Sequence, residues 1–440
     1  MNSKYHSTLQ KLLLESPSNR NLYLTKRKVR IENIIQNLNL DKKQIPTIHI
    51  VGTKGKGSTA AIISSILNES NYNTGLFTSP HLTTVTERIR INLKPITKKD
   101  FYISFGKIWK EIKSKQTKLL GGTSFFEAIM ILALWHFKNK KTNIQIMEAG
   151  IGGENDSTNY INSMLTIITN ISLDHQKILG KTIEEIQKNK SGAIKENTPV
   201  ALAPQTKTAL NIIQNKAKQT NSSLNYVPHL IKITSRKTTS SYQSFTARTK
   251  TNKYKIKTSL LGKHQIENIS LSILAAEILN KKNYTISKKN IENGIAKAAW
   301  DGRLQIIKKH KNKYFIDGAH NLHSTNQLIQ SLKEIQKNNF ILIYGASSGH
   351  LYKESIKALA AISSKIYFVK SRHPKAIPTS NFIKNIETTQ TSFYQYPNVK
   401  SALKQLDNQN ENILITGSLA IVGEALEYLN NITPELYPYL

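Results

Sequence analysis

The chain contains no cysteine among its 440 residues. Disulfides, thiolate metal sites and cysteine nucleophiles are therefore excluded, and any bound metal must be held by oxygen or imidazole ligands. Long apolar runs are also missing. The chain has no stretch of about 18 apolar residues, which is the length needed to span a bilayer. The first residues, Met1-Asn-Ser-Lys-Tyr-His, lack the apolar core of a signal peptide. We therefore expect a cytoplasmic protein with no membrane partner.

Acidic residues are scarce: 28 Asp and Glu stand against 62 Lys and Arg, which gives a formal charge of +34. This charge is compatible with nucleic-acid binding, with an enzyme that attracts anionic substrates, or with a lysine-rich composition that has no function of its own. The lysines are spread along the chain, and no long basic block alternates with aromatic residues as a nucleic-acid groove requires. We favour the compositional explanation and expect no nucleic-acid partner.

A glycine loop follows the β-rich stretch that starts at Pro46, with the sequence Gly52-Thr-Lys-Gly55-Lys56-Gly57-Ser58-Thr59. Glycines let backbone N–H groups turn toward an anion, and the helix expected from Thr59 onward adds the positive end of its dipole. Lys56 would reach a β- or γ-phosphate oxygen, and the Ser58 or Thr59 hydroxyl would hold Mg²⁺. A plain glycine turn is the alternative, but the strand, glycines, lysine and hydroxyl follow in the order of a phosphate-binding loop.

The hydrophobic pattern predicts an α/β fold of two or three domains, since 440 residues exceed one ordinary core. Strands alternate with helices, which is typical of a mostly parallel sheet covered on both faces. Residues 222–258 predict a small antiparallel excursion. A second, Rossmann-like α/β pattern follows a hinge at Trp300-Asp-Gly-Arg303, which puts a domain boundary near residue 298. The predicted strands cover 74–77, 143–147, 164–171, 313–316, 340–344, 365–369 and 412–416, and the predicted helices cover 60–68, 125–137, 182–194 and 262–279.

Four further segments place polar side chains directly after predicted strands, where open α/β sheets bind their ligands. They are residues 77–82, 147–159, 169–175 and 316–321. Each alone could be a solvated cap or an ordinary turn. Together, beside a phosphate-binding loop, they indicate a hard-cation site with Glu148 as charged ligand, Ser58 and Ser79 as hydroxyl ligands and His175 as imidazole ligand.

These motifs resemble the folylpolyglutamate synthase and dihydrofolate synthase family of the Mur-type amide ligases, over nearly the whole chain. The matching segments are Gly-Thr-x-Gly-Lys-Gly-Ser at 52–58, Thr-Ser-Pro-His-Leu at 78–82, Glu87-Arg88-Ile89, Phe-Phe-Glu at 125–127, Glu148-x-Gly-x-Gly-Gly, Asp174-His175, His264-Gln265-x-x-Asn268, Gly302-Arg303 and Asp317-Gly-Ala-His-Asn321. The segments at 79–82 and 125–127 look more like the folate branch than the cell-wall branch. The resemblance implies a P-loop, Mur ligase-type ATP-binding central domain over residues 1–298 and a glutamate-ligase domain over residues 299–440.

The resemblance also implies roles for individual residues. ATP would be bound by Gly55, Lys56, Gly57, Ser58, Thr59, Asn268, Arg303, Asp317 and His320. Two Mg²⁺ ions would be held by Ser58, Ser79, Glu148, His175 and Lys190, with Lys190 carbamylated so that it offers a negative oxygen ligand. Folate or pterin would contact Ser124, Phe125, Phe126, Asn155, Asp156 and Ser157. Catalytic roles would fall to Lys56, Lys190, His175 and Arg303.

Some residues depart from the family pattern. Lys54 stands where the family usually has Asn, Asn189 and Ser191 flank Lys190 in place of Glu and Ala, and Asp301 replaces the hinge Pro. None of these changes removes a phosphate or metal ligand. For Lys190 the alternative is a solvated lysine on a helix that also carries other lysines.

The expected activity is ATP-dependent addition of L-glutamate to dihydropteroate or reduced folates through an acyl phosphate. The expected partners are these small molecules, and the expected state is a monomer. A cell-wall ligase acting on a UDP-muramyl peptide would share the glycine loop and the hinge. A basic P-loop NTPase acting with nucleic acid is the alternative from another class. The choice between dihydrofolate synthesis and polyglutamate extension stays open at this point.

Overall fold

The computed structural model describes residues 2–14, 17, 20–41, 44–173, 176–309, 311–335, 339–348, 352–383 and 391–435. The α-helices are α1 (Asn2–Leu13), α2 (Arg20–Thr25), α3 (Arg27–Asn37), α4 (Lys56–Glu69), α5 (Lys98–Ile112), α6 (Lys115–Leu119), α7 (Phe125–Asn139), α8 (Gln176–Leu179), α9 (Ile183–Ser191), α10 (Lys207–Gln219), α11 (Val227–Leu230), α12 (Lys263–Lys281), α13 (Lys288–Lys297), α14 (Leu322–Ile335), α15 (Lys353–Ala360), α16 (Ser380–Ile383), α17 (Val399–Leu406) and α18 (Leu419–Asn430). The strands are β1 (Thr47–Val51), β2 (Thr74–Phe77), β3 (Ile89–Ile91), β4 (Lys94–Pro95), β5 (Ile144–Glu148), β6 (Leu165–Ile168), β7 (Val200–Leu202), β8 (Leu224–Tyr226), β9 (Lys232–Thr238), β10 (Gln243–Arg248), β11 (Lys253–Thr258), β12 (Gln305–Lys309), β13 (Asn312–Ile316), β14 (Phe340–Tyr344), β15 (Ser363–Val369), β16 (Ser392–Tyr396) and β17 (Asn412–Thr416). Two 3₁₀ turns, η1 (Val85–Arg88) and η2 (Ser157–Tyr160), complete the list.

The first sheet has eight strands in the order β4-β3-β2-β5-β1-β6-β7-β8. Strand β1 lies inside this sheet and pairs in parallel with β5 on one side and β6 on the other. The neighbours β2-β5, β6-β7 and β7-β8 also pair in parallel. Only β3 and β4, at one edge, add antiparallel pairs, β2 with β3 and β3 with β4. The carboxyl ends of β2, β5, β1 and β6 therefore meet at one edge, where polar loop residues can form a shared site.

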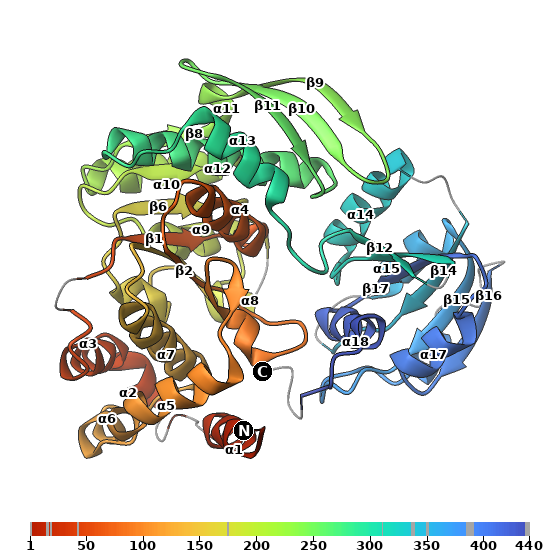
Figure 1. Cartoon of the computed structure of the whole chain (residues 1–440), viewed down its shortest axis with the longest axis horizontal. Helices are drawn as coiled ribbons and strands as arrows, with labels where there is room; N and C mark the ends of the chain where they lie inside the picture. The colour runs from red at the N-terminus through yellow and green to blue at the C-terminus, as the bar shows by residue number, and fades with distance from the viewer. Residues whose placement is uncertain are drawn as a thin grey trace.

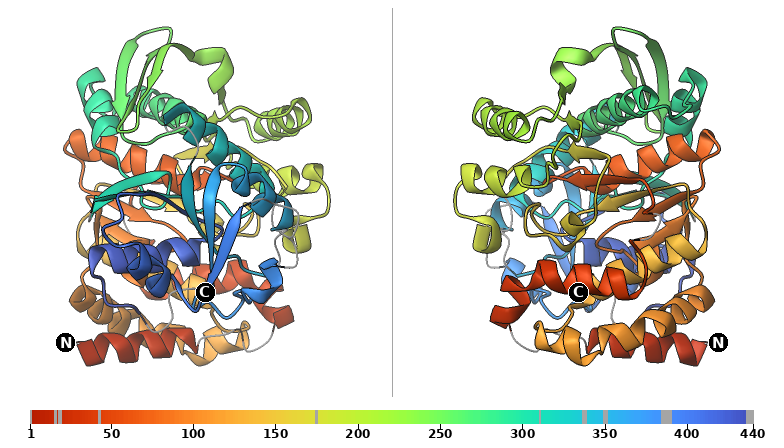
Figure 2. Two further views of the ribbon diagram at one scale, coloured as in Figure 1. Left: turned by 90° about the vertical axis from the view of Figure 1, so that its right-hand side faces the viewer. Right: turned by 90° about the vertical axis from the view of Figure 1, so that its left-hand side faces the viewer.

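Helices cover both faces of this sheet, because its strands are apolar on both sides. On one face Ile48 and Ile50 pack with residues of α4, α12 and α13. On the other face Phe77 and Met147 pack with residues of α1, α3, α5 and α7. Figure 1 and Figure 2 show the two helical layers with the sheet between them.

A separate three-stranded antiparallel sheet, in the order β11-β10-β9, follows the first sheet along the chain. It is drawn at the top of Figure 1. The antiparallel excursion predicted for residues 222–258 is therefore correct for residues 232–258. It is wrong for 222–231, because β8 pairs in parallel with β7 and α11 follows it. The sequence Leu224-Asn-Tyr226 is too short to show whether its partner is parallel or antiparallel.

The second large sheet has six strands in the order β12-β13-β17-β14-β15-β16. All its pairs are parallel except β12 with β13. Helices α14, α15 and α16 cover one face, and α17 and α18 cover the other. The predicted α/β fold class, with two mostly parallel sheets and a small antiparallel one, is confirmed. The domain boundary near residue 298 lies between α13 and β12 and stays a prediction.

The two large sheets are linked by the segment from α13 to β12 and by a contact near the other end of the chain. Glu435, which follows α18, has a buried carboxylate that accepts hydrogen bonds from the Tyr5 hydroxyl at 2.6 Å and from the Val85 backbone N–H at 2.9 Å. The end of the second α/β region is thus held against α1 and η1 of the first. Within the described ranges, no helix has the length and apolar character needed to cross a membrane.

Candidate active site

The glycine loop lies between β1 and α4, and its helix begins earlier than the sequence predicts. We expected the helix from Thr59 onward, but α4 begins at Lys56. Gly55 is the N-cap residue and has a left-handed φ of +91°, which glycine adopts at little cost. The backbone turn therefore finishes at Gly55, and Lys56, Gly57 and Ser58 form the first helical turn. Their unpaired N–H groups and the helix dipole favour an anion at this position.

Two lysines converge on one carbonyl oxygen of the glycine loop. The Nζ atoms of Lys190 and Lys56 donate to the backbone oxygen of Gly52, at 2.7 Å and 3.3 Å respectively. Lys190 lies on α9 and is only 3% exposed, so the alternative of a solvated surface lysine is wrong. Two ammonium groups this close repel each other, and an anion between them or a change in the charge of one lysine would relieve the repulsion.

Glu148 ends β5 directly beside the glycine loop, because Glu148 pairs in register with Ile50 of β1. Its carboxylate is 3% exposed and accepts a hydrogen bond at 3.0 Å from the backbone N–H of Ser79, which follows β2. Burial raises the pKa of the Glu148 carboxyl, while the positive charges of Lys56, Arg303 and Arg88 and the Ser79 hydrogen bond act against that rise. The structure thus brings Ser79 and Glu148 together with the loop, as predicted.

The first two turns of α12 lie against the glycine loop on its other side. Asn268 packs against Gly55, where a Cβ atom would lie 2.3 Å from the Asn268 side-chain oxygen. Asn268 also donates to Gln265 at 3.0 Å, and Gln265 lies 3.4 Å from the Ser58 hydroxyl. The predicted ATP-binding residue Asn268 therefore lies at the glycine loop, and Gln265 is an additional polar neighbour.

Residues of the second α/β region also lie at the edge formed by the glycine loop and Glu148. The Asp317 carboxylate accepts hydrogen bonds from the backbone N–H groups of Leu304 and Ala319, both at 2.8 Å. Burial raises the pKa of Asp317, and the Arg303 charge opposes that rise. His320 lies 3.2 Å from Lys54 Nζ through its Nε2 atom. Lys54, which departs from the family pattern, thus contacts the second region directly.

One cavity is lined by some residues of each region. It is lined by residues of the glycine loop, the segment after β2, the end of β5, the hinge and the start of α18, namely Gly57, Thr78, Ser79, Pro80, Leu82, Glu87, Arg90, Glu148, Trp300, Asp301, Arg303 and Leu419. The hinge residue Trp300 lies against Gly57, where a Cβ atom would be 3.0 Å from Trp300 Nε1. A side chain at position 57 would therefore require the Trp300 ring to shift by a few tenths of an ångström.

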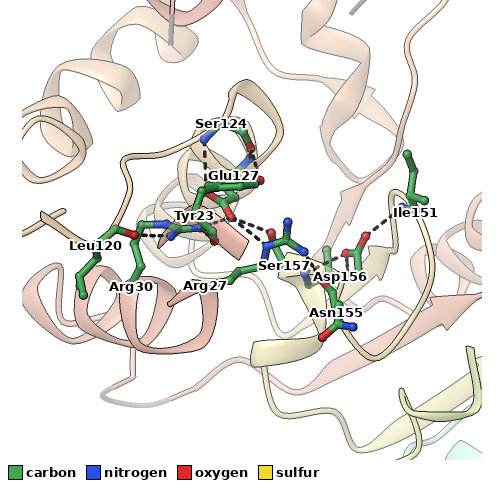
Figure 3. A network of polar contacts seen from close by, with 11 residues as sticks. Tyr23, Arg27, Arg30, Leu120, Ser124, Glu127, Ile151, Asn155, Asp156 and Ser157 are labelled. Atoms are coloured by element: carbon green, nitrogen blue, oxygen red, sulfur yellow. Dashed lines mark hydrogen bonds and ion pairs between the residues drawn. The ribbon is translucent and has the colours of Figure 1, made fainter. Parts of the chain in front are cut away.

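The predicted folate- or pterin-binding residues form a second group, of which Figure 3 shows Ser124, Asn155, Asp156 and Ser157. Ser124 caps α7, and Phe125 and Phe126 lie in its first turn. Arg88 lies 5.1 Å above the Phe125 ring, and Phe126 contacts Phe77 at a ring separation of 5.6 Å.

Asn155, Asp156 and Ser157 supply the rest of this group. They lead into η2, and the Asp156 carboxylate accepts hydrogen bonds from the backbone N–H groups of Ile151 and Thr158. The Ser157 hydroxyl donates to Glu127 on α7 at 3.1 Å. The structure therefore places both predicted segments side by side.

The predicted metal ligands suit Mg²⁺ in part. Glu148, Ser58 and Ser79 lie at the edge where the phosphates are expected, and Mg²⁺ is usually held by one or two carboxylates together with substrate phosphates. The described residues contain no cluster of three Asp, Glu or His side chains that would hold a metal by themselves. His175 lies outside the described residues. Lys190 as an ammonium group does not fit a cation site, so its predicted role requires the carbamate.

Some neighbours of the site were not among the predicted residues. Arg88 donates to His81 at 2.8 Å, and its positive charge opposes the rise in the pKa of Glu148. Arg88 and His81 both lie in motifs that carry the family resemblance, but neither was predicted as a site residue. Tyr23 and Arg27, which contact the predicted pterin residues, have no motif and could not have been found from spacing.

Comparison with known proteins agrees with this geometry. The family description "Mur ligase middle domain" matches residues 50–276, and "Mur ligase, glutamate ligase domain" matches residues 302–419. The dihydrofolate synthase/folylpolyglutamate synthase of Bacillus subtilis is 34% identical over 400 residues, which cover 90% of this chain and 93% of that protein. The folylpolyglutamate synthase of Lacticaseibacillus casei is 30% identical over 91% of this chain and 94% of its own length.

Solved structures have the same fold over nearly the whole chain. The apo form of L. casei FPGS superposes with a TM-score of 0.85 at 28% identity, covering 97% of this chain and 99% of that one. An FPGS–AMPPCP complex gives a TM-score of 0.84 with the same identity and coverage. With matches of this extent in sequence and in fold, the chain belongs to the Mur ligase family of ATP-dependent ligases, in the branch of the folylpolyglutamate and dihydrofolate synthases.

Proposed function

We propose that this ligase joins L-glutamate to the carboxyl group of dihydropteroate or of a reduced folate, with ATP as co-substrate. The observation that carries the proposal is the cavity lined by Gly57, Glu148, Arg90 and Arg303, because it joins the predicted phosphate-binding loop to cations from both α/β regions. A solved FPGS–AMPPCP–folate complex, 28% identical with a TM-score of 0.83, supports this pairing of nucleotide and folate.

The first step activates the carboxylate, which is a poor electrophile. A carboxylate oxygen attacks the γ-phosphorus of ATP, the bond to the bridging oxygen breaks, and ADP leaves behind an acyl phosphate. Charge moves across the phosphoryl oxygens during this step, and proteins contribute chiefly by placing positive groups there. Lys56 on the loop and Arg303 at the hinge are the groups we assign to this task.

The second step forms the amide. The glutamate amine attacks the acyl carbon, the tetrahedral intermediate releases inorganic phosphate, and the amine loses a proton. Water would hydrolyse the acyl phosphate, so the two regions must stay closed on it. The contact of Trp300 with Gly57 and the contact of His320 with Lys54 support closure at this point.

We assign Mg²⁺ to Glu148, Ser58 and Ser79, with His175 as a further ligand. When bound, the cation would neutralise phosphate charge and orient the polyphosphate. A second Mg²⁺ at a carbamylated Lys190 is part of the proposal. The convergence of Lys190 and Lys56 on Gly52 supports it, because a carbamate would replace one of two adjacent positive charges with a negative one.

Glu148→Gln is expected to raise the Mg²⁺ concentration needed for half-maximal activity sharply, about tenfold or more, because it removes the anionic ligand but keeps the shape. Thermal unfolding without Mg²⁺ should change little, since the amide can still accept from Ser79. His175→Ala should act in the same direction. Unchanged Mg²⁺ titrations in both variants would place the cation elsewhere.

A phosphate-release assay tests the proposed reaction. The enzyme is given ATP and Mg²⁺, with L-glutamate and, in turn, dihydropteroate, reduced folates, a UDP-muramyl peptide or a polynucleotide. Phosphate release that requires both glutamate and a pteroate or folate supports the proposal and shows which substrate is preferred. Release driven by the muramyl peptide, or by the polynucleotide with a steep salt dependence, would replace it. A cytoplasmic location, a monomeric state and the lack of a nucleic-acid partner stay predictions.

A further inference from the structure

The two segments proposed to bind the pteridine come from distant parts of the chain. Ser124–Phe126 begin α7, whereas Asn155–Ser157 form the turn into η2. A pocket built from two such segments keeps its shape only if other groups fix their separation. The groups that do so define a further layer of the substrate site, and this reasoning rests on the proposed function.

Glu127 connects the two segments. Its carboxylate is fully buried, and one oxygen accepts from the Ser124 backbone N–H at 3.2 Å. The other oxygen accepts from the Ser157 hydroxyl at 3.1 Å. Arg30, also fully buried, donates to this second oxygen at 2.9 Å and balances the charge. Removing either Arg30 or Glu127 would leave a buried charge without its closest partner and disturb folding.

Two residues on α2 and α3 contact the same segments from the edge, where they can be changed at lower cost (Figure 3). Arg27 is 16% exposed in its side chain, and its Nε atom lies 3.6 Å from the Glu127 carboxylate. Its guanidinium also donates to the backbone oxygen of Asn155. The Tyr23 hydroxyl donates to the Ser124 hydroxyl at 3.1 Å.

Two guanidinium groups lie over the Tyr23 ring. Arg27 lies 4.9 Å and Arg30 lies 4.5 Å from the ring centroid. Burial is the main reason why the pKa of the Tyr23 hydroxyl is raised, followed by the charge of Glu127. The hydroxyl thus stays protonated and available as a donor to Ser124. Tyr23 and Arg27 form one unit in which each side chain fixes the other.

We infer that Arg27 and Tyr23 are positioning residues for the pteridine pocket: Arg27 holds the Asn155 turn and Tyr23 holds the Ser124 cap, so that both face the substrate at a fixed separation. Their effect falls on the binding of the pteroate or folate substrate. We expect ATP binding to be unaffected, because the contacts of Arg27 and Tyr23 within the described part of the chain go to Ser124, Glu127, Asn155 and Arg30 and not to the glycine loop.

The test measures steady-state constants for each substrate separately in Arg27→Met, Arg27→Lys and Tyr23→Phe. Arg27→Met should raise KM for the pteroate or folate about tenfold, the size expected for a lost charge-assisted hydrogen bond. Tyr23→Phe should raise it about threefold. KM for ATP and kcat at saturating pteroate or folate should change less than about twofold. Arg27→Lys should be intermediate, because a single ammonium cannot span both Glu127 and Asn155.

Lys28 provides the matched control on the same helix, because its side chain is 68% exposed and pairs only loosely with Glu32 at 3.9 Å. Lys28→Met should leave all constants unchanged. Equal changes in KM for ATP and for the pteroate or folate, or an unchanged KM for the latter in Arg27→Met, would overturn the inference while leaving the proposed function intact. A wild-type enzyme that ligates no pteroate or folate would overturn both.

Discussion

Lys56→Ala should lower kcat by on the order of 10²–10³-fold or more, the cost of removing one positioned charge from a developing oxyanion. Lys56 opens α4 at the anion-binding turn and contributes to the electrostatics of Glu148. Its charge would act on the transferring phosphoryl group, where charge develops most strongly. Single-turnover measurements at saturating ATP would separate this loss from weaker nucleotide binding.

The fold should survive this change. Lys56 is only half-buried, and its one described hydrogen bond is a long contact of 3.3 Å to Gly52. Alanine is also a good helix former, so α4 should not lose stability. A variant with a normal melting temperature that keeps more than about a tenth of the wild-type kcat has lost less than about 1.4 kcal/mol, which would contradict the role of Lys56.

Lys190→Ala should lower ligase activity by about 10²-fold or more. The activity should partly recover when short-chain carboxylates are added. A carbamate at this position would present hard oxygen atoms to a cation, which an ammonium group cannot do. Formate or acetate could occupy the space of the missing group. The measurement is ligase activity as a function of carboxylate concentration, with sodium chloride at equal ionic strength as control.

Lys190→Arg separates this role from a purely structural one. If Lys190 served only to donate to the Gly52 carbonyl, arginine could donate there as well and activity would persist. Arginine forms no carbamate under these conditions, so the carbamate account expects an inactive enzyme. Lys188→Ala, at an exposed position of the same helix, is the matched control and should behave like wild type. Near-normal activity of Lys190→Arg would contradict the carbamate.

The strands and the loop that define the site could be predicted because their signals are local. Thr74–Phe77, Phe340–Tyr344 and Asn412–Thr416 were predicted with the observed bounds, since short apolar, β-rich runs flanked by turn residues are typical of buried parallel strands. The start of α4 was missed by three residues, because Lys56-Gly57-Ser58 has the composition of a loop. Only the left-handed conformation of Gly55 ends the turn early enough for these residues to be helical.

Contacts between distant residues could not be predicted from one sequence. Lys190 carries a charge that normally lies in water, and its burial depends on a carbonyl at Gly52, 138 positions earlier. Tyr23 and Arg27 belong to helices with weak apolar patterns, and their partners on α7 and η2 become visible only in the fold. Glu435 likewise accepts a hydrogen bond from Tyr5, which is 430 positions earlier in the sequence. Motifs indicated the chemistry, while tertiary packing decides which charges are held beside it.

The most direct test of the proposed reaction follows a carboxyl oxygen. Dihydropteroate, or the reduced folate preferred in the phosphate-release assay, is labelled with ¹⁸O in its reacting carboxyl group and converted with ATP and L-glutamate. If the carboxylate attacks the γ-phosphorus, one labelled oxygen must leave with inorganic phosphate when the amide forms, and mass spectrometry of the phosphate should show the label in step with product. Product formation with unlabelled phosphate would contradict activation through an acyl phosphate.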